Sequence, residues 1–158
     1  MIKYMKKNLY LVLCLLAALT LVVSGCKKDK EAEPETFDGN VAAPTWTAPS
    51  KYDYNSTMTA VIKVDLKAQY PTIAANWKSS ENDLLAAFAG DQLVGLGNQI
   101  EAGLYNLMIV DAEGEITLRY YSVYYKNLFE AKDAFPYHKD DRLGTPDRPF
   151  VPTWVVVK

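Results

Sequence analysis

Short apolar runs separated by turn signals are the feature that most restricts how this chain can fold. Residues 57–66 alternate, with apolar side chains at Met58, Ala60, Ile62, Val64 and Leu66. Such alternation indicates a half-buried strand. Further runs cover 84–89, 92–98, 104–110, 115–125 and 154–157, with turn signals at 90–91 and 111–114. No long segment has a helical period, so we expect an all-β fold, an antiparallel β-sandwich that is immunoglobulin-like in general architecture.

The first 25 residues have a different character. Lys3, Lys6 and Lys7 precede an apolar run at 9–23, and the small residues Ser24 and Gly25 follow it. A basic segment, an apolar run and a small-residue site together predict a secretory signal. The run is shorter than the roughly 20 apolar residues of a spanning helix, which disfavours the alternative of an uncleaved membrane anchor.

The residues around the end of this signal, Val23-Ser24-Gly25-Cys26, resemble a bacterial lipobox. The resemblance implies that Cys26 carries lipid on its sulfur and becomes the first residue of the mature protein. Two or more acyl chains give stable membrane anchoring, since each buried CH2 contributes about 0.8 kcal/mol. Cys14 leaves with the signal, so we expect no disulfide.

The sequence therefore predicts three parts. Residues 1–25 are a lipoprotein signal peptide, 26–56 are the lipidated Cys with a flexible tether and a lead-in, and 57–158 are the β-sandwich domain. Residues 27–35 are charged and almost free of apolar groups, which is typical of flexible segments. A charged stretch after the lipidated Cys resembles the surface-export tethers of Bacteroidetes lipoproteins. That implies an outer-membrane protein facing the exterior, and a plain spacer into the periplasm is the alternative.

Charge and composition narrow the class of partner. The chain has 17 Lys and Arg against 19 Asp and Glu, and three of the Lys belong to the signal. The net charge beyond the signal is therefore near −5. Nucleic acid is not an expected partner, because phosphate binding needs a clustered positive surface. A single His and no clustered Cys disfavour a His/Cys metal site.

Four sequence blocks in the domain are similar to a β domain of Bacteroidetes secreted proteins and lipoproteins. The blocks are Asp83 to Asp91, Gly103-Leu104-Tyr105, Gly114 to Tyr121 and Leu143 to Phe150. The resemblance covers about 57–157 and implies no settled catalytic activity. Family members commonly have acidic and Arg residues after the first block, where this chain has Gln92-Leu93-Val94.

The chemical candidates are few. His138 has no second His and no nucleophile motif to work with, so a solvated loop residue is the favoured interpretation. Asp140, Asp141 and Asp147 are weak calcium candidates, because six to eight oxygens would have to converge and turn aspartates explain the pattern equally well. We expect no cofactor, no metal and no catalytic residue.

Aromatic residues are the richest surface signal. Tyr120, Tyr121, Tyr124 and Tyr125 fall within six positions, and adjacent strand residues point to opposite faces. We expect Ile116, Leu118 and Tyr120 to face the core. Tyr121 and Tyr125, with Trp77, form the candidate binding surface. The alternative is that these rings simply cover the sheet, since Tyr is a favoured strand residue.

These observations predict a lipid-anchored envelope lipoprotein that acts as a non-catalytic binding or assembly module, with a protein or a glycan as partner. One alternative is a structural subunit of a surface assembly, for which the uncharged 154–157 run is the motivating feature. A minor alternative is a small envelope hydrolase.

Overall fold

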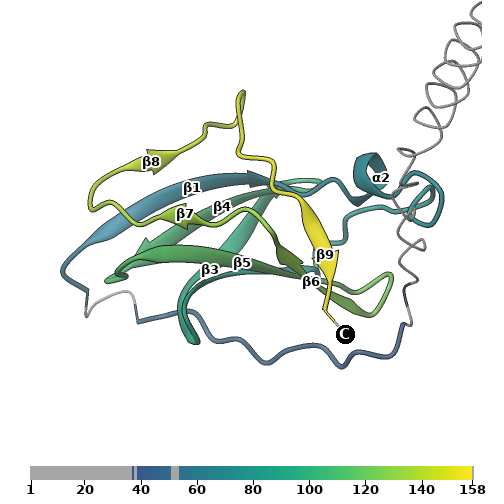
Figure 1. Ribbon diagram of the computed structural model, residues 1–158, viewed down its shortest axis with the longest axis horizontal. Coiled ribbons are helices and arrows are strands. Elements are labelled where there is room, and N and C mark those ends of the chain that lie inside the picture. The colour runs from purple at the N-terminus through teal and green to yellow at the C-terminus, as the bar shows by residue number, and fades with distance from the viewer. Residues whose placement is uncertain (1–36, 38, 51–53, 158) are drawn as a thin grey trace, which may run out of the picture. The chain divides into compact units, whose positions relative to one another are not determined.

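The computed structural model describes residues 37, 39–50 and 54–157, and these are nearly all β (Figure 1). The expected signal, Cys26 and the expected tether lie outside the described residues. In chain order the elements are β1 (Thr57–Lys63), α2 (Leu66–Gln69), β2 (Leu84–Ala89), β3 (Gln92–Glu101), β4 (Leu104–Val110), β5 (Glu115–Ser122), β6 (Asn127–Ala131), β7 (Phe135–Pro136), β8 (Arg142–Leu143) and β9 (Trp154–Val156). None of the described helices is long and apolar enough to cross a membrane.

The strands form one continuous sheet in the order β8-β1-β4-β3-β2-β5-β6-β9, with β7 paired to β5. The sheet curls into a half-barrel (Figure 1). Strands β2, β3 and β4 are consecutive hairpins, and β1 and β5 lie beside β4 and β2. This order contains two overlapping Greek keys. The all-β prediction is confirmed. The expectation of purely antiparallel pairing is wrong at one edge, because β8 runs parallel to β1.

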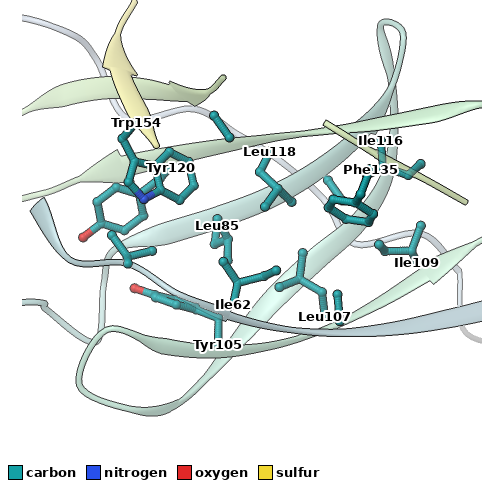
Figure 2. Packing of buried hydrophobic residues seen from close by; sticks show 14 of the residues in the cluster. Ile62, Leu85, Tyr105, Leu107, Ile109, Ile116, Leu118, Tyr120, Phe135 and Trp154 are labelled. Atoms are coloured by element: carbon teal, nitrogen blue, oxygen red, sulfur yellow. The ribbon is translucent and has the colours of Figure 1, made fainter. Parts of the chain in front are cut away.

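Curling brings the inner faces of the two flanks together around the core. The side chains that fill it come from both flanks and include Ile62, Tyr105, Leu107, Ile109, Leu118, Tyr120, Phe129 and Trp154, each at most 1% exposed. Figure 2 shows Tyr105, Tyr120 and Trp154 gathered at one end and Phe135 with Ile116 toward the other. The expected core face of 115–120 is confirmed, since Ile116, Leu118 and Tyr120 are fully buried.

The strand β1 is shorter than the alternating apolar run, 57–66, that predicts it. All five apolar side chains of the predicted face in 57–66 are buried, but β1 ends at Lys63. The Asp65 side chain accepts a hydrogen bond from the Ala68 backbone N–H at 3.0 Å and so begins α2. A carboxylate in this position satisfies a helical N–H that otherwise lacks a partner. Local capping chemistry therefore overrides the strand pattern at its last two positions.

Glycines in β3 let neighbouring strands approach closely. A Cβ on Gly95 would lie 2.8 Å from the Met108 carbonyl oxygen, and one on Gly97 would lie 3.1 Å from the Leu85 Cβ. The β2–β3 register shifts between Ala87 and Phe88, directly opposite Gly95. The β2–β3 pair therefore combines a register shift with close packing of the strands at these two glycines.

The outer edge of β1 is covered by the segment 140–150. Backbone hydrogen bonds join Asp140 N to Thr57 O, Thr59 N to Asp141 O, and Phe150 N to Val61 O. Prolines within and beside this segment (Pro146, Pro149 and Pro152) donate no backbone hydrogen bond, which suits an edge exposed to other chains. The fourth sequence block is therefore an edge cover. Its Gly144 has φ +73°, and an added Cβ there would lie 2.9 Å from the Val61 carbonyl oxygen.

The other edge, β9, is closed by side chains of and beside α2. The Gln69 side-chain oxygen accepts from the Trp154 backbone N–H at 2.7 Å, and the Tyr70 hydroxyl donates to the Trp154 carbonyl at 2.6 Å. The Gln69 amide also donates to the Pro152 carbonyl at 2.7 Å. Edge groups of a strand are available for pairing with other chains unless something covers them. Here a single turn of helix satisfies them within the same chain.

We predict that Tyr70→Phe destabilises the domain. The substitution keeps the ring, which packs on Phe37 at 5.5 Å, and removes only the hydroxyl that satisfies the Trp154 carbonyl. Loss of one partner of a partly buried hydrogen bond costs about 1–2 kcal/mol of unfolding free energy. Urea denaturation measures this, with Tyr124→Phe as the control because that side chain is exposed. Equal effects of the two substitutions would contradict the edge-closing role.

Candidate functional site: two hollows beside a buried carboxylate

A buried carboxylate organises the end of the sheet where the loop after α2 meets the β5–β6 turn. Asp83 is 5% exposed and accepts hydrogen bonds from the Tyr120 hydroxyl at 2.5 Å and from the backbone N–H groups of Ser80 and Val123, each at 2.8 Å. Three donors compensate much of the cost of burying a charge. The first residue of the first sequence block is thus bonded to Tyr120 of the third block. Asp83 therefore holds both the loop before β2 and the β5–β6 turn in place.

Two tyrosine hydroxyls of this region are strongly perturbed. Burial raises the pKa of Tyr105 to about 12. Burial, followed by the negative charge of Asp83, raises the pKa of Tyr120. The Trp77 indole N–H lowers the pKa of Tyr120 by a smaller amount, although no hydrogen bond of good geometry joins the two groups. Both hydroxyls are therefore neutral donors at neutral pH, a state that suits structural hydrogen bonds.

One hollow lies over β3 and is lined by Ser79, Glu81, Gly97, Asn98, Gln99, Ile100, Glu101 and Ala102, with a volume of about 460 Å³. We call it the polar hollow. Gln99 donates to the Ser79 hydroxyl oxygen at 2.7 Å, and that hydroxyl lies 3.5 Å from the Tyr105 hydroxyl. The Gln99 side-chain oxygen has no hydrogen-bond donor among the described residues. The lining presents amides, a hydroxyl and two carboxylates, which are groups that pair with hydroxyl-rich ligands.

The second hollow, of about 440 Å³, is lined by Lys67, Ala75, Asn76, Trp77, Lys78 and Tyr124. We call it the aromatic hollow. Tyr124 is 58% exposed, and its ring packs edge-on against Tyr125 at 4.8 Å. The two charged side chains of its lining are both lysines. The segment 75–81 contributes to both hollows, so one loop holds a cationic aromatic surface beside a polar acidic one.

The frame of the aromatic hollow is held by local hydrogen bonds. Successive turns follow α2, where Ala74 N bonds to Tyr70 O and Trp77 N to Ala74 O. The Tyr125 hydroxyl donates to the Ile73 carbonyl at 3.3 Å and so joins this loop to the β5–β6 turn. Exposed residues on such a frame lose little conformational freedom when a ligand binds.

The predicted candidates have different positions. Tyr121 is only 4% exposed, so the expectation that it is exposed is wrong. The lead-in 39–50 runs over the outer face of β5 and covers it, and the Tyr121 hydroxyl donates to the Val41 carbonyl at 3.0 Å. Tyr125 is half-buried against Phe37 at 4.6 Å, whereas Trp77 lines the aromatic hollow. The structure thus brings Trp77 and Tyr125 to one end of the domain and leaves Tyr121 under the lead-in.

The lead-in packs on the domain through Trp46, whose ring contacts that of Phe88 with centroids 5.6 Å apart. The Gly39 N–H donates to the Asn127 side-chain oxygen at 2.8 Å, and Val41 N bonds to Lys126 O at 2.9 Å. Alternation in β5 cannot reveal this cover, because it comes from residues about 80 positions earlier in the sequence. The outer face of the sheet is therefore partly a second buried surface.

The aspartate candidates take part in turns. Asp140 has φ +61°, Asp141 accepts from the N–H of Arg142 at 2.8 Å, and Asp147 lies in the turn closed by Thr145 and Arg148. Within the described ranges, no group of three or more His, Cys, Asp and Glu is placed to hold a metal ion. His138 is exposed, and its carbonyl accepts from the Asp141 N–H at 3.2 Å.

Several lining residues were not singled out by sequence reasoning: Lys67, Lys78, Asn98, Gln99 and Tyr124. Gly97 was the available signal for the polar hollow, because a glycine inside a strand indicates close approach of other groups. The aromatic hollow depends on the packing of the loop after α2 against the β5–β6 turn, which no local pattern encodes.

Comparison of the chain with protein-family models, with curated proteins and with solved structures finds no match in any of the three.

We predict that the tyrosine hydroxyls make stability fall at alkaline pH. The folded-state pKa of Tyr105 is above its ordinary value of 10, so its contribution is fully present below pH 10 and is lost as the pH rises toward about 12. Each such group adds a slope of about 1.4 kcal/mol of unfolding free energy per pH unit in this range. Urea denaturation between pH 9 and 11.5 measures the slope.

Tyr105→Phe should reduce this alkaline slope by about 1.4 kcal/mol of unfolding free energy per pH unit. Tyr124→Phe should leave the slope unchanged because the Tyr124 ring is exposed. An alkaline slope that is the same in Tyr105→Phe and in the unsubstituted protein would show that this hydroxyl titrates normally.

Proposed function

We propose that the protein is a lipid-anchored lipoprotein of the bacterial cell envelope whose β domain is a non-catalytic binding module for a glycan. The lipobox-like sequence ending at Cys26 supports the anchor, and the charged stretch behind it supports an outer-membrane location with the domain facing the exterior. The lead-in that packs on the sheet ties the expected tether firmly to the domain.

The single observation that carries the binding proposal is the polar hollow. Gly97 lies in its lining, and because this glycine has no side chain the core residues Leu85 and Tyr105 come close to β3 from the inner side, where an added Cβ would lie 3.1 and 3.3 Å from them. Its lining includes exposed Asn98 and two acidic residues, together with Gln99, whose amide donates to the Ser79 hydroxyl oxygen and whose side-chain oxygen is buried without a donor among the described residues. Sugar hydroxyls both donate and accept, so they match a lining of amides and carboxylates better than an apolar peptide surface would. The volume of about 460 Å³ is within the usual range of small-ligand sites.

A glycan is favoured over strand addition by a protein partner. The 154–157 run was the feature that motivated a structural subunit, and the outward-facing backbone groups of Trp154 are bonded to Gln69 and Tyr70. A peptide that added to β9 at this residue would have to displace both side chains.

We also propose that the curled sheet belongs to the β-sandwich class. Facing aromatic contacts across the core support it, such as Tyr105 against Tyr120 with ring centroids 6.2 Å apart. The Greek-key order supports an immunoglobulin-like general architecture.

We predict that Cys26→Ser prevents lipid attachment and leaves the signal uncleaved. A thiolate is required as the acyl acceptor in the lipobox reaction implied by the resemblance, and a hydroxyl does not replace it. Radiolabelled palmitate incorporation and the mass of the N-terminal peptide measure this in the expressing cell. Cys14→Ser is the matched control, because Cys14 lies in the expected signal and should not affect labelling. Equal labelling of both variants would contradict the anchor.

We predict that Asn98→Ala and Gln99→Ala weaken glycan binding by roughly three- to tenfold each, which corresponds to one lost hydrogen bond of about 0.5–1.5 kcal/mol. A glycan array followed by calorimetry with the best ligand measures this. Gln92→Ala is the control, because Gln92 is an exposed amide at the other end of the same strand. Binding that survives both substitutions would place the glycan elsewhere, and the absence of any glycan ligand would contradict the module.

A further inference from the structure

The first described residue, Phe37, and the aromatic hollow lie at the same end of the domain. Phe37 is the first described residue, and its ring packs on Tyr125 at 4.6 Å and on Tyr70 at 5.5 Å. Tyr125 in turn contacts Tyr124, which lines the hollow, at 4.8 Å. The chain coming from Cys26 therefore enters the domain at Phe37. The Phe37 ring contacts Tyr125, and Tyr125 contacts the exposed Tyr124.

The length of chain between the lipid and this point is short. Eleven residues, 26–36, precede Phe37, and they span at most about 40 Å when fully extended. The flexible tether that the sequence predicts for this stretch would have a root-mean-square length of roughly 18 Å. A domain of this size has a diameter of about 35 Å. The end that carries Phe37 is then, on average, the end nearest the membrane.

The chemistry of that end matches a membrane surface. Tyr124 is exposed and has an amphipathic ring of the kind that lies at the headgroup level of bilayers, while Trp77 lines the hollow as a half-buried ring whose N–H is buried. Lys67 and Lys78 are exposed, and they are the only charged side chains in the lining of the aromatic hollow among the described residues. This concentration of positive charge stands out in a chain whose net charge beyond the signal is near −5. The nearest acids in sequence have other positions: the Asp65 side chain caps α2, and Glu81 lines the polar hollow.

We propose that the aromatic hollow docks on an anionic lipid headgroup of the membrane that holds the anchor. The ammonium groups of Lys67 and Lys78 pair with the headgroup phosphate, and the exposed ring of Tyr124 rests at the interface, with half-buried Trp77 beside it. This inference depends on the proposed lipidation of Cys26 and adds to it a fixed orientation of the domain. The polar hollow, across the 75–81 segment, keeps its separate role.

A weak electrostatic attraction is enough for such docking, because the tether keeps the domain at a high local concentration near the membrane. A basic residue near an anionic surface contributes about fivefold to binding, so two lysines contribute about 25-fold. That is modest for a protein free in solution. It is substantial for a domain that a short linker holds near the surface, where the effective concentration is in the millimolar range.

The experiment uses the full lipidated protein reconstituted into vesicles of phosphatidylcholine, with or without phosphatidylglycerol whose acyl chains are brominated. Bromine quenches tryptophan fluorescence at short range, so docked Trp77 reports its own position. Trp46→Phe and Trp154→Phe in the same chain remove the other two indoles. We expect quenching with brominated phosphatidylglycerol that falls as salt is raised, because exposed charges are screened within a Debye length.

Lys67→Ala combined with Lys78→Ala should lower the docked-to-free ratio by about 25-fold. Lys132→Ala with Lys139→Ala is the matched control, since both lysines are exposed and lie outside the hollow. Quenching that is equal in the two double variants, or that does not depend on the anionic lipid, would overturn the docking proposal.

Flotation of the same vesicles separates this failure from failure of the anchor. Protein that floats with phosphatidylcholine alone but shows no lipid-dependent quenching keeps its anchor and lacks the docking contact. Protein that does not float lacks the anchor, and the docking proposal falls with it.

Discussion

The hydrogen bond between the Asp83 carboxylate and the Tyr120 hydroxyl is the constraint on which the functional end of this domain depends. It is buried and 2.5 Å long, and the same carboxylate also receives the backbone N–H groups of Ser80 and Val123. One side chain at the start of β2 therefore fixes the loop before it and the turn after β5. Without it, a buried hydroxyl and two backbone donors would lack partners together.

The position of Asp83 also explains how a sheet this small can carry two hollows. Ser80 lies within the loop 75–81 that lines both hollows, and its N–H donates to Asp83. The turn that carries Tyr124 begins at Val123, whose N–H donates to the same carboxylate. Both are anchored to the same buried group, so their surfaces have a fixed separation. A binding surface made from loops is precise only when such buried contacts hold its frame.

Much of the fold follows from periodicity, and the rest does not for identifiable reasons. Strands 84–89 and 104–110 were predicted at their observed bounds, because an apolar run between turn signals decides them locally. The end of β1 was missed because Asp65 caps a helix, and the parallel β8 was missed because two residues in a Pro-rich segment have no period to detect. The predicted run 115–125 continues past the end of β5 at Ser122, where the β5–β6 turn begins.

The candidate surface shows a different limit. Of the candidate binding residues, Trp77 lines the aromatic hollow, but Tyr121 is covered by the lead-in at Val41, which is far away in the sequence. Alternation of polar and apolar residues assigns each residue to one of the two faces of a strand. It does not indicate whether the outer face is exposed to solvent or covered by another segment. The burial of Tyr121 is thus a tertiary effect of a segment that local reasoning treats as a spacer.

The glycines connect packing with function most directly. At Gly97 the core comes so close that Leu85 and Tyr105 leave no room for a side chain on the inner face of β3. The same stretch of β3 lines the polar hollow, with Asn98 and Gln99 beside it. The glycine therefore sets how closely the strand that carries the hollow lies to the core. A larger residue at this position would press on Leu85 and Tyr105 and would strain the packing beneath the hollow.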